Sequence, residues 1–289
     1  MDAIKFYKTT ENYLNKVAKS RGVTNLTKYY SLTDFHKGGF VNNYQELSQV
    51  FVQMAFHAQN ATMISNIVNF EKNLAFLDKL TFGFEPKKFL KKYSSNDREK
   101  DVEKLVEVFR YDEKKNPHGL RWNSNKSKPK NKDAIAKRYA NCLLDCSKYL
   151  SQFNTRQDVV DDLLKHYTNN DYRKLVKYFR KNIQSGYSVA LTCDFLKEFD
   201  RKFDLPKPDI HIMDTLTTYY QYDDDYYKKN DSRAFECIDD FVALVEEINT
   251  KLKKSITVYQ LDRMVWLICS GKFFLDNIQD TKTEYLKQI

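Results

Sequence analysis

The chain has 289 residues, of which 42% are hydrophobic and 30% charged, and a formal net charge of +9 at pH 7. Gly (7) and Pro (5) are scarce, which argues against an all-β protein because such folds need many tight turns. The basic balance favours a polyanionic partner, nucleic acid or an anionic membrane surface, although many basic proteins bind neither.

The apolar spacing predicts an all-α protein. From Tyr44 to Leu80, apolar residues recur at three- and four-residue steps, which is the period of an amphipathic helix. The same spacing predicts the following helices: 1–30, 44–80 with a break at 57–60, 84–93, 101–111, 133–150, 159–166, 172–179, 189–199, 210–220, 234–252 and 258–270. Loops are expected at 116–132 and 220–231, where polar residues dominate.

No apolar run approaches the roughly 18 residues of a membrane span, and the first residues lack the apolar core of a signal peptide. The five cysteines are an odd number and are expected to be reduced, buried thiols. Cys142 and Cys146 lie one helical turn apart, but no second pair has ligand spacing, so core packing is favoured over a metal. We therefore expect a cytoplasmic protein with no metal, no cofactor and no membrane contact.

The polar segment 116–132 is the clearest loop of the chain. Lys126, Lys128, Lys130 and Lys132 fall in its second half, where they form either a solvated linker or a contact with DNA phosphates. In the second interpretation, the neighbouring Arg121 and Trp122 would lie nearer the base.

The stretch 182–216 carries the most chemical information. It is expected to contain a helix end, a tight hairpin at Ser185-Gly186-Tyr187-Ser188, a buried helix, a turn bounded by prolines, and Asp209 at the next helix N-terminus. Backbone N–H groups at such a hairpin can bind a phosphate, and an acid at a helix N-terminus stays ionised and oriented. Asp209 can equally be only a helix N-cap, which is the common role of an Asp after a proline.

This stretch resembles the helix-hairpin-helix segment and catalytic Asp of the DNA glycosylase superfamily that includes endonuclease III, and in particular the archaeal-type 8-oxoguanine DNA glycosylases. Gly186-Tyr187-Ser188 corresponds to the family's hairpin, and Asp209-Ile210-His211-Ile212 to its Asp motif. Segments 51–63, 134–150 and 261–273 resemble further family segments in the same order, so that the resemblance extends over most of residues 45–275.

The resemblance implies a two-lobed helical fold with a DNA-binding cleft between the lobes. One lobe would hold a bundle near residues 50–190, and the other would combine residues 1–45 with 195–289. The partner would be double-stranded DNA, bound by a monomer with no obligate protein partner.

Two departures from the family pattern change the expected chemistry. The hairpin ends in Ser188 where the family usually has Gly, and the position of the family's catalytic Lys is taken by Ala190 or, in the other register, by Ser188. Without that amine nucleophile, the resemblance implies a monofunctional glycosylase that leaves an abasic site. The closely spaced cysteines of the iron–sulfur members are also missing, so no cluster is expected.

The expected reaction is hydrolysis of a base–deoxyribose bond in DNA, with an oxidised purine favoured as the damaged base. Asp209 would stabilise the positive charge that builds on the sugar and align the attacking water. The base must first leave the duplex, which requires a wedge and a pocket. Gln59 and Asn60 are the wedge candidates. The pocket candidates are Phe56, Arg121, Trp122, His211, Asp262 and Trp266.

Two other functions are compatible with the same residues. One is the same chemistry aimed at a hypermodified base of phage DNA, as in antiviral defence. The other is a DNA-binding module that kept the fold and lost the activity, which the missing Lys and the altered hairpin suggest.

Overall fold

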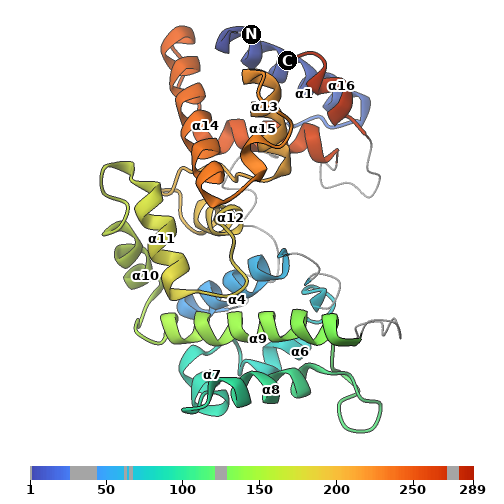
Figure 1. Ribbon diagram of the computed structural model, residues 1–289, viewed down its shortest axis with the longest axis vertical. Helices are drawn as coiled ribbons and strands as arrows, with labels where there is room; N and C mark the ends of the chain where they lie inside the picture. Colours follow the sequence, from blue (N-terminus) through green and yellow to red (C-terminus); the bar gives the residue numbers. More distant parts are fainter. Residues whose placement is uncertain (1, 27–43, 62–63, 65–67, 121–128, 272–279) are drawn as a thin grey trace. The chain divides into compact units, whose positions relative to one another are not determined.

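The structure is a computed structural model that describes residues 2–26, 44–61, 64, 68–120, 129–271 and 280–289, with the backbone alone at 129–133 (Figure 1). In these residues the regular structure consists of thirteen α-helices and two short 3-10 helices, which confirms the all-α prediction. Extended pairing is limited, within the same ranges, to two isolated bridges, Arg110 with Leu120 and Asp112 with Asn116. None of the described helices is both long and apolar enough to cross a bilayer.

The chain divides into two compact units. Unit 1 comprises residues 1–38 and 196–289, and unit 2 comprises residues 39–195, whereas the resemblance implies lobe boundaries at 45–50 and 190–195. The helices of unit 2 are α4 (Glu46–Gln59), α6 (Leu74–Leu80), α7 (Pro86–Tyr93), α8 (Arg98–Phe109), α9 (Pro129–Leu150), α10 (Arg156–Leu164) and α11 (Tyr172–Asn182). Those of unit 1 are α1 (Ala3–Ser20), α13 (Ile210–Tyr220), α14 (Asp231–Leu252), α15 (Val258–Ser270) and α16 (Lys282–Leu286). Helix α12 (Val189–Phe199) contains the division between the units.

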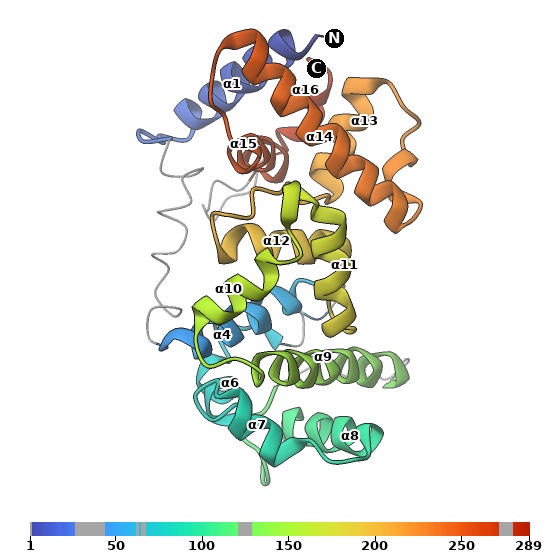
Figure 2. The ribbon, with the colours of Figure 1, turned by 90° about the vertical axis from the view of Figure 1, so that its left-hand side faces the viewer.

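Unit 2 is organised around α9, which contacts α4, α7 and α8 (Figures 1 and 2). Apolar residues of α9 recur on one face and are buried, among them Tyr139, Leu143 and Leu150. Cys142 and Cys146 lie on this buried face with their sulfurs 3.8 Å apart, and burial raises the pKa of the Cys146 thiol well above its ordinary value. All five cysteines are free and buried.

Unit 1 joins the first helix of the chain to the last ones. Helix α1 packs on α14 and α15, and α13 packs on α14 and α15. A hydroxyl pair, Thr10 Oγ1 and Tyr285 OH at 2.8 Å, links α1 to α16 inside the core, and the marked ends of the chain both lie in this unit (Figure 1). The position of Asp209 therefore depends on a core built from segments distant in sequence.

The loop expected at 116–132 is shorter than predicted. Helix α9 begins at Pro129, so Lys130 and Lys132 belong to the helix. Proline suits the first helical position because its fixed φ matches the helix and its missing N–H would be unpaired there. Lys126 and Lys128 lie outside the described residues.

Candidate functional site: the α11–α12 turn and the Asp209 helix start

The expected hairpin is a tight turn between α11 and α12. Gly186 has φ +84°, and a Cβ added there would lie 2.8 Å from Cys142 Sγ on α9. A residue with a side chain would therefore meet both backbone strain and a clash with the core. The turn depends on glycine at this position.

Side chains from α8 and α9 hold the start of the turn. Asp145 accepts hydrogen bonds from the backbone N–H groups of Gln184 and Ser185, at 3.2 and 3.3 Å. Its other carboxylate oxygen accepts a hydrogen bond of 2.6 Å from Arg98. Burial raises the pKa of the Asp145 carboxyl, and the Arg98 charge opposes that shift. The turn is thus fixed by a charged network, which no motif of the sequence indicated.

Tyr187 and Ser188 have opposite roles in the turn. Tyr187 is buried, donates a hydrogen bond of 2.7 Å to the carbonyl of Met54, and packs edge-on against Phe179. Ser188 is exposed, and its hydroxyl accepts a hydrogen bond of 3.2 Å from Leu191 N–H, so it caps α12. Only Ser188 of the two therefore presents its side chain to solvent.

Two backbone donors of the turn have no acceptor within the described residues. The N–H groups of Gly186 and Ser188 donate to no acceptor in the described part of the chain, and they precede the first turn of α12. Unpaired N–H groups at a helix N-terminus suit an anion such as a DNA phosphate. Ala190, which with Ser188 is one of the two residues that the resemblance offers for the family's Lys position, is half-buried and has no reactive side-chain group.

A Gly186→Ala variant should be destabilised by about 2 kcal/mol or more, because the left-handed backbone and the contact with Cys142 both disfavour a methyl group. Thermal unfolding measures the loss. A Gly186→Ala/Cys142→Ala variant removes the sulfur but keeps the Cβ of residue 142, so relative to Cys142→Ala alone it should recover the part of the loss that is due to the sulfur. Equal stability of Gly186→Ala and the native chain would contradict this account of the turn.

Asp209 is the N-cap of α13. Its Oδ1 accepts hydrogen bonds from the N–H groups of His211 (2.9 Å) and Ile212 (3.3 Å). Its Oδ2 lies 3.8 Å from the Lys207 ammonium group, and the side chain is 17% exposed. One oxygen is thus fixed by the helix start, while the other lies near the ammonium group of Lys207, whose side chain is 19% exposed. A carboxylate in this geometry is oriented and can approach a reacting sugar.

A buried ion pair holds the segment that leads to Asp209. The Lys197 ammonium group and Asp262 Oδ1 are 3.0 Å apart, and their side chains are 1% and 2% exposed. Asp262 Oδ2 accepts a hydrogen bond of 2.5 Å from the backbone N–H of Lys207, two residues before Asp209. Burial raises the pKa of the Asp262 carboxyl, and Lys197 opposes this. Asp262 thus links α12, α15 and the approach to α13.

His211 is the second residue of α13. Its Nδ1 is buried with no hydrogen-bond partner among the residues that the structure describes. Burial lowers the pKa of His211 below its ordinary 6.5; Asp209 opposes this shift, and Lys282 and Lys207 add to it. The ring is therefore favoured in its neutral form beside the Asp209 carboxylate.

This lowered pKa predicts a pH dependence of stability. The stability that comes from a neutral His211 ring is fully present above the pKa that His211 has in the unfolded chain. It is lost as pH falls through the lower pKa that His211 has in the folded protein. The native chain should therefore lose more stability than a His211→Gln variant when pH falls from about 8 to about 5. Urea unfolding of both proteins at each pH measures the difference. Parallel losses in the two proteins would mean that His211 titrates alike in both states.

The surroundings of Asp209 contain groups that the sequence analysis missed. Asp214 lies in α13, about one turn after its start. The ammonium groups of Lys228 and Lys282 each lie 2.5 Å from a carboxylate oxygen of Asp214, which places two cations beside α13. Ile210, directly after Asp209, is 50% exposed. No sequence signal marked these residues, because Lys282 comes from α16 and an isolated apolar residue at a helix start fits the core pattern equally well.

The remaining candidates fall into two groups. In unit 2, Gln59 is buried, and its Oε1 accepts a hydrogen bond of 2.9 Å from Phe70 N–H, so it contacts the interior, whereas Asn60 is exposed after α4. Phe56 is half-buried, with its ring 5.7 Å from Phe70. The geometry favours Asn60 over Gln59 as a residue that meets a ligand.

In unit 1, Trp266 is half-buried beneath the Arg263 guanidinium, 4.7 Å from its ring, and Asp262 is engaged inside the core. Because the Asp262 carboxylate is buried and bonded to the Lys207 N–H, it is better placed to position the Lys207 segment than to contact a base. Arg121 and Trp122 lie outside the described residues.

Comparison with protein-family models, with curated proteins and with solved structures finds no match for the chain.

Proposed function

We propose that the chain is a monofunctional DNA glycosylase, which hydrolyses the N-glycosidic bond of a damaged or modified base in double-stranded DNA. The resemblance to helix-hairpin-helix glycosylases favours an oxidised purine as the substrate. The observation that carries the proposal is the geometry of the Asp209 carboxylate. Its Oδ1 is fixed by two backbone N–H groups, its Oδ2 lies 3.8 Å from the Lys207 ammonium group, and the side chain is 17% exposed.

The chemistry of the bond fits such a carboxylate. Departure of the base leaves positive charge on the deoxyribose, and a fixed negative charge on one face of the sugar stabilises that state. The same oxygen can align or deprotonate the attacking water. Because Oδ1 is bound, the carboxylate need not reorient when charge develops, which is the condition for effective electrostatic stabilisation.

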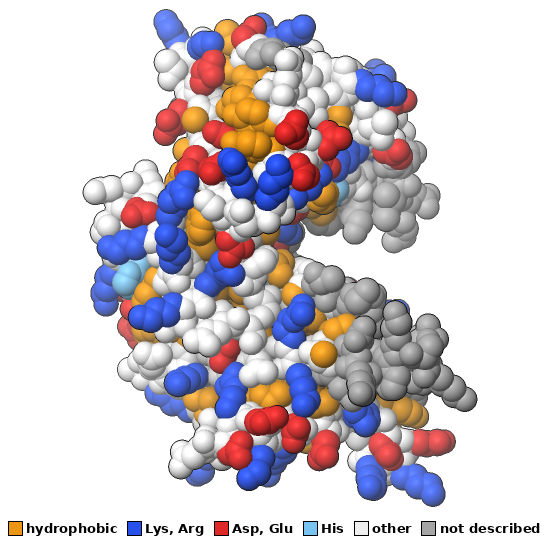
Figure 3. Space-filling view, in the orientation of Figure 1, with side chains coloured by type: hydrophobic (Ala, Val, Ile, Leu, Met, Phe, Trp, Pro, Cys, Tyr) orange, Lys and Arg blue, Asp and Glu red, His pale blue; other side chains and the backbone are white. Residues whose placement is uncertain are grey.

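The turn between α11 and α12 supports the DNA-binding half of the proposal. Its unpaired N–H groups can bind a phosphate, and the net charge of +9 favours a polyanion. Figure 3 shows many Lys and Arg side chains on the visible surface, with acidic side chains among them. Affinity for duplex DNA should consequently fall steeply with salt.

The residues at the family's lysine position support hydrolysis without strand cleavage. Neither Ser188, which caps α12, nor Ala190 carries an amine. An amine nucleophile is what forms a covalent imine with the sugar and leads to strand breakage. The product should therefore be an intact strand with an abasic site.

The test is base release from end-labelled duplexes that each carry one damaged or naturally modified base, beginning with 8-oxoguanine. Half of each sample is heated in alkali, which breaks the strand at abasic sites. Breaks that appear only after alkali would support a monofunctional glycosylase. Breaks without alkali would contradict the monofunctional reaction, and absence of release from every duplex together with tight binding would favour a DNA-binding module.

The panel also separates the two enzymatic alternatives. Hypermodified pyrimidines from phage-type DNA are included beside repair substrates at equal concentration. Preferential release of a hypermodified base would assign the chain to the antiviral alternative, while preferential release of an oxidised purine would support repair.

A further inference from the structure

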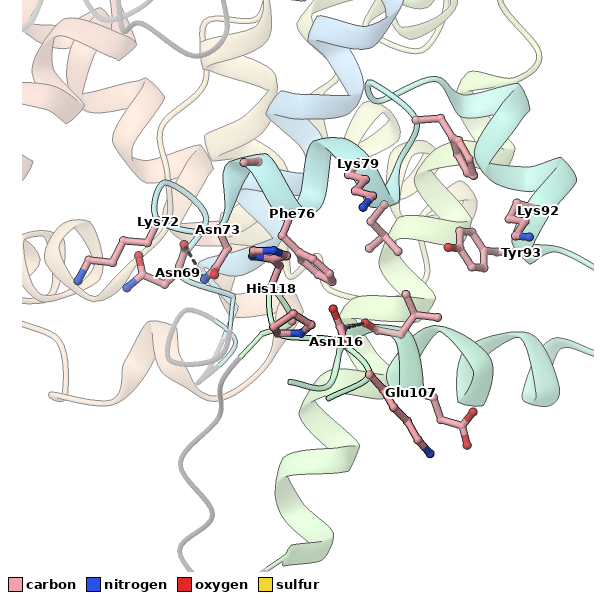
Figure 4. A pocket seen from close by; sticks show the side chains of 17 residues that line it. Asn69, Lys72, Asn73, Phe76, Lys79, Lys92, Tyr93, Glu107, Asn116 and His118 are labelled. Carbon is pink, nitrogen blue, oxygen red and sulfur yellow. Dashed lines mark hydrogen bonds between the residues drawn. The ribbon is translucent and has the colours of Figure 1, made fainter. Parts of the chain in front are cut away.

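A hollow of about 1250 Å³ lies within unit 2, formed by residues of the segment before α6, α6 itself, the turn after it, the end of α7, the end of α8 and residues 115–119 (Figure 4). We call it the α6–α8 hollow. It contains none of the residues of the α11–α12 turn or of the Asp209 helix start. Its volume exceeds what one small metabolite needs, so it suits a segment of an extended ligand.

Four lysines give the α6–α8 hollow its charge. Lys72, Lys79, Lys92 and Lys115 line it and are exposed, and Glu107 is the single acidic residue among its lining residues. None of the four ammonium groups has an ion pair or hydrogen bond to any residue in the described part of the chain. Many other lysines are paired, as Lys137 is with Glu103 and Lys251 with Glu247. Four positive charges against the single negative charge of Glu107 around one concavity favour an anionic ligand.

An exposed aromatic ring stands at the rim of the hollow. Phe82 is 40% exposed and has φ +58°, and the next two residues, Gly83 and Phe84, also have positive φ values of 75° and 54°. Non-glycine residues rarely adopt this conformation, so the turn is strained at both phenylalanines. Phe84 gains a place in the core, with its ring 5.7 Å from that of Phe51. Phe82 stays 40% exposed, with its ring 6.4 Å from that of the buried Tyr93.

Phe76 adds a further ring to the same hollow, which the buried Tyr93 also lines. Phe76 is half-buried and points from α6 toward the loop that holds Asn116 and His118 (Figure 4). Aromatic rings among lysines form the combination that binds unpaired nucleotides, because bases stack on aromatic faces while ammonium groups contact phosphates. A duplex hides its base faces and would not use the rings.

We propose that the α6–α8 hollow binds single-stranded nucleic acid, with Phe82 and Phe76 stacking on bases and Lys72, Lys79, Lys92 and Lys115 contacting the phosphates. This site goes beyond the proposed glycosylase reaction and does not depend on it. Single-stranded DNA and single-stranded RNA both offer bases and phosphates to such a site, and the test below distinguishes the two ligands.

The test measures fluorescence anisotropy of labelled twelve-residue oligothymidylate and oligouridylate with the full chain. Lys79→Gln/Lys115→Gln should weaken binding about tenfold at low salt, and the slope of log affinity against log salt should fall by about 0.7 for each lysine removed. Phe82→Asn should weaken binding about tenfold, because the ring is lost while asparagine tolerates the positive φ. The oligonucleotide bound more tightly identifies the natural strand.

Matched variants make the outcome decisive. Lys148→Gln/Lys165→Gln removes two exposed lysines of unit 2 that do not line the hollow and should leave affinity within about twofold. Asp209→Asn should also bind the oligonucleotides normally, so failure of base release and failure of this site are separate results. The proposal would be overturned if the variants of the α6–α8 hollow bound the oligonucleotides as tightly as the control variant Lys148→Gln/Lys165→Gln. A duplex that binds as tightly, with the same loss in Phe82→Asn, would overturn it as well.

Discussion

Asp209→Asn should reduce base release by about 10³-fold while leaving thermal stability nearly unchanged. The amide keeps an oxygen that accepts from the N–H groups of His211 and Ile212, and asparagine caps helices about as well as aspartate. What the substitution removes is the negative charge that would stabilise the sugar cation, and loss of one such electrostatic group typically costs about 10²–10³-fold or more. Single-turnover base release and thermal unfolding of the same preparations give both quantities.

A matched control separates chemistry from capping. Asp171 is the N-cap of α11, and its carboxylate accepts a hydrogen bond from Lys174 N–H, so Asp171→Asn makes the same change at another helix start. That variant should keep full activity. Asp209→Ala, which removes the cap as well, should lose about 1 kcal/mol of stability in addition to activity. Full activity of Asp209→Asn would leave Asp209 with the role of a helix cap alone.

Lys197→Met should destabilise the protein by about 3–5 kcal/mol and lower Tm by about 10 °C. The substitution removes the cation that faces Asp262 in a site where both side chains are at most 2% exposed. A buried carboxylate that has lost its cation either remains charged at high cost or takes up a proton. Because the proton becomes easier to bind at low pH, the loss of stability should be larger at pH 7 than at about pH 5.

The double variant Lys197→Met/Asp262→Asn tests the electrostatic cause of that loss. Asparagine keeps an oxygen for the Lys207 N–H and carries no charge, so the double variant should recover most of the stability lost by Lys197→Met. Urea unfolding of the native chain, the two single variants and the double variant gives the four free energies of unfolding of a double-mutant cycle. Additive losses in the double variant would show that the two side chains contribute independently and would contradict a coupled pair.

The helices themselves were largely predictable, but their starts were not. Apolar spacing placed three helix starts at Asp101, Val159 and Ala234, whereas α8, α10 and α14 begin at Arg98, Arg156 and Asp231, three residues earlier in each case. The missing turns are polar and are stabilised by side-chain caps. Asp97, Thr155 and Asn230 accept hydrogen bonds from the third residue of their helices. Hydrophobic periodicity identifies the buried face of a helix but does not identify a first turn that is polar and exposed.

The candidate site was predictable where it is local in sequence. Gly186 in a tight turn and Asp209 at a helix start follow from neighbouring residues, and the structure shows both geometries. The network around them was not predictable, because Asp145, Lys197 and Asp262 join positions 39 to 65 residues apart. Gln59 shows the same limit, since its amide turns inward to bind Phe70 N–H in a core that only the assembled unit creates.

The chain path of unit 1 has a consequence for synthesis. Helix α1 packs on α14 and α15, so it emerges from the ribosome more than two hundred residues before its partners. At about 5–20 residues per second, that interval lasts on the order of ten seconds or longer. Unit 2 can complete its own core during this time, while the apolar face of α1 has none of these partners to pack against. Nascent chains halted before α14 should therefore expose α1 to chaperones and proteases while residues 39–195 already resist digestion.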